Sequence, residues 1–247
     1  MPTVLAPAKL TVSLRVTGVR NDGYHLIDAE MVSLELHDAL EIDEGGSGLE
    51  IVGPAGHQHL GPDDDNLVTR ALALCGRRAH VRLHKAIPAG AGLGGGSSDA
   101  AAVLRWAGFD DAVAAATIGA DVAFCLRGGR ARVRGVGEIV EPLPFVARTY
   151  TLLTPPIMCS TPAVYAAWDR LGGPQGEHGN DLEPAALDVA PDLVRWRDEL
   201  ADVSGQRPRL AGSGSTWFVE GAYPGDGRVV VATVPAETMP AETMPAE

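Results

Sequence analysis

The chain has 247 residues, of which 45% are hydrophobic and 21% are charged, and this balance is typical of a folded globular protein. Its 32 Asp and Glu residues outnumber its 20 Lys and Arg residues, so the formal net charge is -12. This acidity argues against a nucleic-acid or anionic-membrane partner, since both bind basic surfaces. A small phosphorylated substrate needs only a local positive site, so the negative net charge does not exclude one.

Cysteine usage and the N-terminal segment favour a cytoplasmic location. Three cysteines, at positions 75, 125 and 159, stand in apolar or small-residue surroundings, and their odd number favours free thiols over a disulfide framework. The first ten residues lack the apolar region of a signal peptide, and no segment approaches the roughly 18 apolar residues of a membrane span. We expect a soluble, cytoplasmic monomer or homodimer.

The first forty residues are predicted to form two antiparallel strands. In the run LTVSLRVTG (10–18) apolar and polar residues alternate, which is the period of a half-buried strand. The tripeptide NDG at 21–23 is a strong turn signal, and a second alternating run follows at 31–42. Strand, turn and strand together predict a hairpin.

Helices and strands then alternate up to residue 143. Asp65 or Asn66 can cap a helix over 67–76, and a strand over 80–88 ends at Pro88. A helix is predicted over 97–106 with Asp99 in its first turn, followed by a short helix at 110–118 and strands within 128–143.

A domain boundary is expected at residue 150, where an apolar strand begins. The predicted elements beyond it are a strand at 150–157, a helix near 162–171, a loop at 171–184, a helix near 191–203 and a strand-turn-strand at 208–221. The predicted domains are therefore 1–149 and 150–234. Residues 235–247 repeat PAETM in tandem and are predicted to be a disordered tail.

The stretch GAGLGGGSSD at 90–99 directly follows a predicted strand and opens a predicted helix. It satisfies the dinucleotide pattern G-x-G-x-x-G, but that fold also needs an acidic ribose ligand about 20 residues later, where this chain has AAAT. The Walker pattern fails because no lysine precedes the two serines, and the other elements of a protein kinase are absent from the sequence.

A more general phosphate site survives these exclusions. Consecutive glycines let backbone N–H groups approach phosphate oxygens, and a helix N-terminus adds positive potential. The alternative is a tight strand-to-helix turn, but one or two glycines would suffice for it. The predicted phosphate-binding residues are Pro88, Gly90, Ala91, Gly92, Leu93, Gly94, Gly95, Gly96, Ser97 and Ser98, with Ser98 as the candidate ligand of a magnesium ion.

The motif PAGAGLGGGSSDAA (88–101) resembles the central phosphate loop of the GHMP kinases, the superfamily of galactokinase, homoserine kinase and mevalonate kinase. Five further segments resemble motifs of this superfamily, or of one branch within it, and occur in the same order: APAKL at 6–10, NDGYHLID at 21–28, IGADVAF at 118–124, NDLEPAA at 180–186 and LAGSGSTWF at 210–218. The resemblance covers nearly the whole chain apart from the PAETM repeat. It implies a two-domain α+β fold, with an N-terminal domain like domain 2 of ribosomal protein S5 and a ferredoxin-like C-terminal domain.

The resemblance implies that Lys9 and Asp121 are the catalytic pair. Phosphoryl transfer needs positioning and charge neutralisation more than covalent chemistry, so a carboxylate that receives the hydroxyl proton and a nearby ammonium suit it. Each residue has an ordinary alternative when it is considered alone. Asp121 could cap a helix, and Lys9 could be an edge-strand lysine.

The branch that NDGYHLID resembles phosphorylates the 2-hydroxyl of a methylerythritol joined to cytidine diphosphate, in the non-mevalonate isoprenoid pathway. The resemblance therefore implies ATP and Mg²⁺ as cofactors and a small-molecule substrate that carries cytidine diphosphate. It places Tyr24 and His25 on the cytosine, and a ring and an imidazole suit a base. The implied substrate-binding residues are Thr11, Tyr24, His25, Tyr165, Gly212 and Ser213. A tyrosine packed on the sheet, and a plain tight turn at 212–215, are the alternatives.

The chain departs from the pattern at three places. Thr11 stands where the family usually has Asn, Ala123 stands where Pro is usual, and the segment between the phosphate loop and Asp121 is shorter. Two other functions are weighed: a GHMP kinase for another small alcohol, such as homoserine or mevalonate, and a non-catalytic nucleotide sensor. The NDGYH stretch argues against the first, and the presence of both Lys9 and Asp121 argues against the second.

Overall fold

A long β-hairpin forms the centre of the protein. The computed structural model describes residues 1–53, 66–236 and 241–242. Strand β1 (Thr3–Val19) pairs with β2 (His25–Asp43) in antiparallel register along almost its whole length, from Thr3 opposite Glu41 to Val19 opposite His25. The predicted hairpin is confirmed, and its turn uses Gly23 at a φ of 87°. Both strands are longer than the alternating runs alone predict.

Strand β2 is the hub of the first sheet. It pairs antiparallel with β1, with β4 and β5 along its two halves, and with the end of β10. The other strands of this part are β3 (Gly48–Val52), β4 (His80–His84), β5 (Arg130–Gly135) and β6 (Ile139–Pro142). Strand β3 runs parallel to β4, and β6 pairs antiparallel with β5.

A second group of strands extends the sheet in the order β10-β7-β9-β8. These are β7 (Thr149–Leu153), β8 (Arg209–Leu210), β9 (Trp217–Glu220) and β10 (Arg228–Val234), and their pairings are antiparallel. The end of β10 also pairs with β2, Thr233 opposite Leu34, so hydrogen bonds run continuously between the two groups. The predicted division into domains at residue 150 falls at the start of β7 and stays a prediction.

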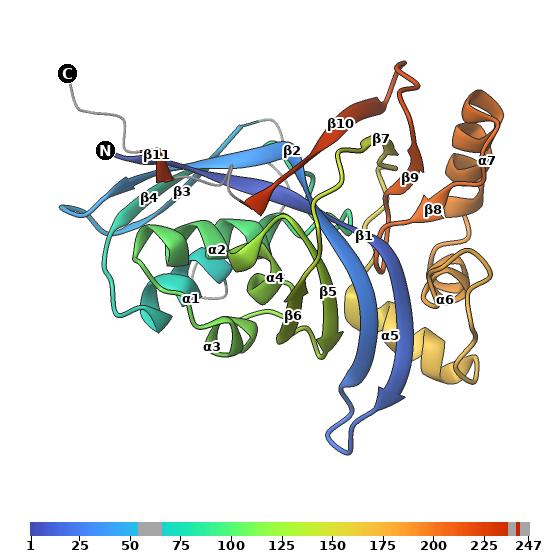
Figure 1. The fold of residues 1–247 in the computed structure, drawn as a ribbon, viewed down its shortest axis with the longest axis horizontal. Coiled ribbons are helices and arrows are strands. Elements are labelled where there is room, and N and C mark those ends of the chain that lie inside the picture. Colours follow the sequence, from blue (N-terminus) through green and yellow to red (C-terminus); the bar gives the residue numbers. More distant parts are fainter. Residues whose placement is uncertain (54–65, 237–240, 243–247) are drawn as a thin grey trace.

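Seven helices lie in the described part of the chain, and they gather in two groups on opposite sides of the bent half of the hairpin (Figure 1). The first group is α1 (Leu67–Leu74), α2 (Gly95–Trp106), α3 (Ala112–Ala116) and α4 (Val122–Arg127). The second is α5 (Thr161–Arg170), α6 (Glu183–Val189) and α7 (Leu193–Ser204). None of these helices is long and apolar enough to cross a membrane.

Two helix predictions need correction. Helix α2 begins at Gly95 rather than at 97, because Gly94 adopts the left-handed conformation, at a φ of 67°, and serves as its N-cap. Helix α6 begins at Glu183, within the segment 171–184 that was predicted as a loop, and the rest of this helix was not predicted. Its start is set by a turn at Asn180, whose side chain accepts a hydrogen bond from the N–H of Leu182.

The hydrophobic core has two parts. The larger cluster lies between the sheet and the helices and includes Phe124 and Trp217, both fully buried. The smaller cluster contains Leu10 of β1, Leu34 of β2 and Leu93 of the glycine stretch. The glycine stretch is therefore anchored by an apolar side chain within it, and not only by backbone contacts.

Part of the predicted disordered tail is described. Ala241–Glu242 form strand β11, which pairs with Thr3–Val4 at the outer edge of β1. An edge strand offers unpaired N–H and C=O groups to any neighbouring chain, which accounts for this pairing. Residues 237–240 and 243–247 of the tail lie outside the described residues, as do 54–65, including Asp65.

Candidate active site

The glycine stretch forms a loop between β4 and α2. Gly90, Gly92 and Gly94 have φ values of 66°, 76° and 67°, in the left-handed region that favours glycine. A Cβ atom on Gly92 would lie 2.3 Å from the carbonyl oxygen of Ala211, so the loop is packed directly on the C-terminal glycine motif. The N–H of Thr216 also donates to the carbonyl of Ala91, at 3.1 Å. Bare backbone is therefore required here by close packing as well as by chain conformation.

A cavity of about 340 Å³ opens over this loop and the N-terminus of α2. Eight of the ten predicted phosphate-binding residues line it: Pro88, Gly90, Ala91, Gly92, Gly94, Gly95, Gly96 and Ser97. Leu93 does not, because its side chain belongs to the smaller core cluster. The backbone N–H groups of a helix start and its positive dipole end suit a phosphate group in this cavity.

Ser98 has a different role from the predicted one. Its hydroxyl donates to the carbonyl of Pro7 at 2.5 Å, and the residue is fully buried. Helix α2 begins two residues earlier than predicted, which turns Ser98 towards β1 and Ser97 towards the cavity. The hydroxyl of Ser98 is thus engaged with the backbone, and Ser98 does not line the cavity, so its role as a metal ligand stays a prediction.

The cavity over the glycine loop is called the phosphate cavity below, after the predicted phosphate-binding residues that line it. A buried cluster of charges lies beside it. The ammonium of Lys85 contacts the carboxylates of Asp38 and Asp99, the latter at 2.8 Å. Asp38 also accepts from the N–H groups of Ala86 at 2.6 Å and Ile87 at 2.8 Å. These contacts tie β2, the end of β4 and α2 together at the base of the loop.

The cluster has one positive charge and two carboxyl groups, so one carboxyl group is in excess. Burial raises the pKa of Asp99 to about 8, with Lys85 opposing the shift. Two backbone N–H groups donate to Asp38, whereas Oδ1 of Asp99 has no hydrogen-bond partner among the described residues. The raised pKa favours the neutral form of Asp99 more than an ordinary carboxyl group would. Burial lowers the pKa of Lys85, but Asp99 and Asp38 together outweigh it and raise that pKa.

Lys9 and Asp121 meet at the inner end of the phosphate cavity. Lys9 is 4% exposed, and its Nζ lies 3.1 Å from Oδ2 of Asp121 and donates to Oγ1 of Thr11 at 3.1 Å. Lys9 and Thr11 are two residues apart on β1 and point to the same face of the strand. Asp121 is the N-cap of α4, yet its side chain makes no capping hydrogen bond. Asp121 does not cap α4 with its carboxylate. β1 is the outer strand of the sheet at Lys9, as the edge-strand alternative has it, but the Lys9 side chain is buried and paired with Asp121 instead of lying in solvent.

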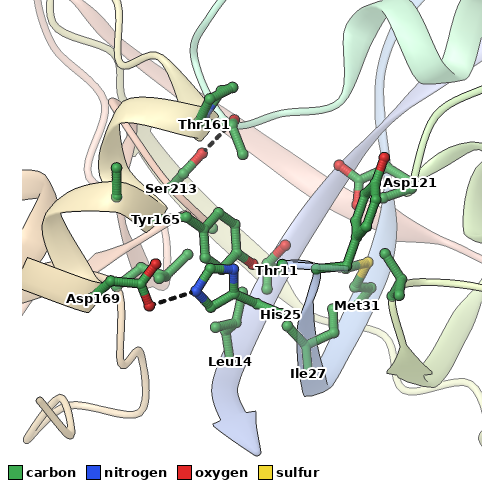
Figure 2. Close-up of a pocket in the computed structure, with 18 of the residues that line it drawn as sticks. Thr11, Leu14, His25, Ile27, Met31, Asp121, Thr161, Tyr165, Asp169 and Ser213 are labelled. Atoms are coloured by element: carbon green, nitrogen blue, oxygen red, sulfur yellow. Dashed lines mark hydrogen bonds and ion pairs between the residues drawn. The ribbon is translucent and has the colours of Figure 1, made fainter. Parts of the chain in front are cut away.

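A second cavity, of about 500 Å³, lies on the other side of this pair. All six residues predicted to bind substrate line it: Thr11, Tyr24, His25, Tyr165, Gly212 and Ser213. Figure 2 shows Tyr165 and Asp169 of α5 beside His25 of β2, with Asp121 across the cavity. Tyr24 is 60% exposed, and the guanidinium of Arg20 lies 5.9 Å from its ring centroid. The lining of the cavity thus combines aromatic rings with the charged pair.

The C-terminal glycine motif separates the two cavities and is held by Asn180. The buried amide of Asn180 donates to the carbonyls of Leu210 at 2.9 Å and Gly212 at 2.7 Å. A Cβ atom on Gly212 would lie 3.5 Å from Nζ of Lys9, so this turn forms a wall beside the charged pair. The hydroxyl groups of Ser213 and Thr161 are hydrogen-bonded at 2.9 Å (Figure 2). The motif is therefore more than a plain turn.

Four residues line both cavities: Lys9, Asp121, Thr161 and Ser213. The charged pair thus lies where a group bound in one cavity would meet a group bound in the other. This arrangement suits transfer of a group between two bound molecules, because it holds the reacting atoms together and supplies charge at their meeting point.

Sequence and fold comparisons agree with this geometry. Residues 66–129 match the GHMP kinases N terminal domain. The chain is 40% identical over 232 residues to the 4-diphosphocytidyl-2-C-methyl-D-erythritol kinase of Paracoccus denitrificans, covering 86% of this chain and 84% of that protein. The protein of the same name from Granulibacter bethesdensis is 36% identical over 270 residues, covering 94% and 89%.

The chain belongs to the 4-diphosphocytidyl-2-C-methyl-D-erythritol kinase family.

The solved structures agree with membership of this family and of the GHMP kinases. A crystal structure of 4-(cytidine 5'-diphospho)-2C-methyl-D-erythritol kinase superposes with a TM-score of 0.71 at 32% identity, covering 94% of this chain and 98% of that one. A homoserine kinase from Cytophaga hutchinsonii superposes with a TM-score of 0.59 at 18% identity, covering 95% and 94%, which shows the shared fold. The predicted two-domain α+β GHMP kinase fold class is confirmed.

Several cavity residues were missed by the sequence analysis. They include Asn66, Leu67, Lys85, Ala89 and Asp99 in the phosphate cavity, Asp169 in the second cavity and Thr161 in both. The sequence could have indicated Lys85, because a lysine at the end of an apolar strand and next to a phosphate loop is well placed to pair with a negatively charged group. No signal existed for Asp169, since a single aspartate on a helix surface is ordinary. Asp99 was predicted in the first helical turn and instead faces Lys85 in the second.

Proposed function

We propose that this protein transfers the γ-phosphoryl group of ATP to the 2-hydroxyl of 4-diphosphocytidyl-2-C-methyl-D-erythritol. The observation that carries the proposal is the Lys9–Asp121 pair at the junction of two cavities, one lined by the glycine loop and the other by aromatic residues. The first cavity suits the phosphates of ATP. The second suits a base at one end and a hydroxyl group at the other.

In this reaction Asp121 accepts the proton of the 2-hydroxyl group. The hydroxyl oxygen then forms a bond to the γ-phosphorus, the bond from that phosphorus to the β,γ-bridging oxygen breaks, and ADP leaves. The ammonium of Lys9, 3.1 Å from Asp121, stabilises the negative charge on the carboxylate and on the developing alkoxide. Thr11 receives a hydrogen bond from Lys9 and helps to keep the ammonium in place, although it replaces the usual Asn.

Mg²⁺ prefers oxygen ligands and is usually bound together with substrate phosphates and several waters. The hydroxyl of Ser97 lines the phosphate cavity, and we propose it as a protein ligand of the ion in place of Ser98, with Asp121 left free to accept the proton. When bound, the ion neutralises charge on the phosphate oxygens.

Tyr24, His25 and Tyr165 support a substrate with a nucleobase. An aromatic side chain can stack on the face of any nucleobase, and such stacking contributes about 1–3 kcal/mol of binding free energy per base. Homoserine and mevalonate have no such group, so a kinase for either compound would gain nothing from these residues. Phosphorylation of another small alcohol is the second candidate, and a non-catalytic nucleotide sensor is the third.

The deciding experiment is a coupled assay of ADP formation with three alcohols. We expect turnover with 4-diphosphocytidyl-2-C-methyl-D-erythritol and none above background with homoserine or mevalonate. Equal turnover with all three would contradict the specific substrate, and no turnover with any of them would favour the sensor. In the same assay Tyr24→Ala is expected to raise the KM for the alcohol by at least about tenfold, the value of one lost stacking contact.

A further inference from the structure

His25 is held on three sides by one face of α5. Its Nε2 lies 2.8 Å from Oδ1 of Asp169, and its ring centroid lies 4.5 Å from that of Tyr165 and 5.5 Å from that of Trp168. These three partners occupy positions three and four apart along the helix, which share one face. The side chain of His25 is 10% exposed, whereas that of Asp169 is 51% exposed. The imidazole therefore has a fixed orientation in the wall of the second cavity (Figure 2).

The contact with Asp169 also determines which ring nitrogen carries the hydrogen atom. An ionised carboxylate only accepts hydrogen bonds, so Nε2 of His25 must donate. A neutral imidazole has one N–H group, and Nδ1 is then a bare acceptor. Nδ1 has no hydrogen-bond partner among the described residues, and His25 lines the cavity. Nδ1 is therefore available as an acceptor for a ligand that reaches the His25 ring from this cavity.

An acceptor at this place distinguishes two pyrimidine bases. Cytosine carries an exocyclic amino group, which donates hydrogen bonds, where uracil carries a carbonyl oxygen, which accepts them. An amino group can donate a hydrogen bond to an unprotonated Nδ1. A carbonyl oxygen cannot, because the oxygen and Nδ1 are both acceptors and no hydrogen atom lies between them. A site built for a donor rejects the analogue that lacks it, because the polar group of the protein then stays unpaired.

We propose that Asp169 is a specificity-determining positioning residue, which holds His25 in the Nε2–H tautomer so that Nδ1 selects a base with an amino group over one with a carbonyl group. The inference rests on the proposed function, since it concerns the base end of the same substrate site. Asp169 acts through His25. Asp169 is half exposed, and its one hydrogen bond to His25 contributes about 0.5–1.5 kcal/mol to stability, so its replacement leaves the fold intact.

The first test is the ratio of kcat/KM for the cytidine substrate to that for its uridine counterpart, measured at about pH 8, where an ordinary imidazole is neutral. We expect the wild type to favour cytidine by about 10–100-fold, the value of one unpaired polar group. In Asp169→Ala the tautomer is free to change, so the ratio falls by about tenfold. Asp169→Glu, which retains a carboxylate, recovers part of the ratio.

The matched control is Asp188→Ala, which removes another exposed carboxylate paired with α5, through Arg170, outside both cavities. We expect its ratio to equal that of the wild type. If Asp169→Ala slows both substrates equally and leaves the ratio unchanged, Asp169 has only a structural role and the inference is wrong. A wild type that uses both substrates equally well also overturns it.

The second test does not depend on turnover. The ¹⁵N chemical shifts of His25, assigned with a His25→Asn variant, report which ring nitrogen carries the hydrogen atom. We expect the Nε2–H tautomer in the wild type at about pH 8 and a mixture of both tautomers in Asp169→Ala. The same mixture in both proteins would overturn the inference even if the enzyme is active. No turnover of either substrate, together with the expected shifts, would count against the proposed function and not against the tautomer.

Discussion

The Nζ atom of Lys9 lies 3.1 Å from Oδ2 of Asp121. Asp121 is the N-cap residue of α4, but its side chain makes no capping hydrogen bond. A carboxylate at an N-cap ordinarily accepts from a backbone N–H two or three residues later. Here it is turned towards an ammonium from the central hairpin and lines both cavities. The local conformation of Asp121 is that of a helix start, while its side chain pairs with Lys9 between the two cavities.

Replacement of Asp121 separates these two roles. We expect Asp121→Asn to lower kcat by about 10²–10⁴-fold, the usual contribution of a general base, with little change in the Kd for ATP. Stopped-flow or steady-state kinetics and calorimetric titration with ATP measure the two quantities. The control is Asp111→Asn, because Asp111 does cap a helix through its carboxylate, α3, and asparagine caps equally well. A loss of ATP binding in Asp121→Asn would indicate a structural role instead.

The contact between the phosphate loop and the C-terminal motif predicts a strong effect of Gly92→Ala. The new Cβ would lie 2.3 Å from the carbonyl oxygen of Ala211 and 2.8 Å from that of Gly214, and both are backbone atoms that cannot rotate away. We expect the KM for ATP to rise by more than about tenfold, since a displacement of 1 Å can cost 10²-fold in rate.

The control for this variant is Gly108→Ala. Gly108 has a φ of 69°, close to the 76° of Gly92, but a Cβ there meets nothing within 4 Å. Both variants share a cost of about 1–2 kcal/mol for a left-handed alanine, and only Gly92→Ala adds a collision. Urea denaturation and ATP titration of the pair therefore isolate the close approach. Equal effects in the two variants would contradict it.

Asn180 is expected to position the wall between the cavities. Asn180→Ala removes both hydrogen bonds to the motif, and each buried carbonyl left unpaired costs about 1–3 kcal/mol. We expect a lower midpoint of urea unfolding and a fall in kcat that exceeds the change in the KM for ATP, because Gly212 borders Lys9. The control is Gln206→Ala, whose exposed amide donates to the carbonyl of Glu220 at 2.7 Å, outside both cavities. Unchanged kcat in Asn180→Ala would contradict the positioning role.

The proton on Asp99 makes stability depend on pH. Because its pKa is raised from 3.8 to about 8, the folded state binds a proton that the unfolded state releases between these values. The contribution of protonated Asp99 to the free energy of unfolding is complete below about pH 4 and is lost as the pH rises through about 8. The free energy of unfolding falls by up to about 1.4 kcal/mol per pH unit over this range. We expect the free energy of unfolding of the wild type, relative to Asp99→Asn, to fall over this range.

Urea unfolding at several pH values measures this difference. Asp188→Asn serves as the control, since that carboxylate is partly exposed and its pair with Arg170 lies at the surface. We expect its curve to run parallel to that of the wild type. A wild type and an Asp99→Asn variant with parallel curves would show that Asp99 is ionised in the folded protein.

The positions that sequence analysis predicted well are those with a local physical cause. Alternating residues and an NDG turn produce the central hairpin because strand period and turn chemistry depend on neighbours alone. The glycine loop was recognisable because left-handed backbone and close approach both require glycine. The direction in which a side chain points was harder to predict from the sequence. Helix α2 begins two residues earlier than predicted, and Ser97 lines the cavity whereas Ser98 donates to the carbonyl of Pro7.

By itself, the sequence determined the hairpin, the phosphate loop, the order of the motifs and hence the family. Only the tertiary structure decided that Lys9 and Asp121 meet between two cavities, that Lys85 lies among Asp38 and Asp99, and that Asp169 contacts His25. The physical reason is that propensities and turns act over a few residues, whereas each of these contacts joins side chains from different elements. Their distances depend on how the helices pack on the sheet, and no local pattern records that packing.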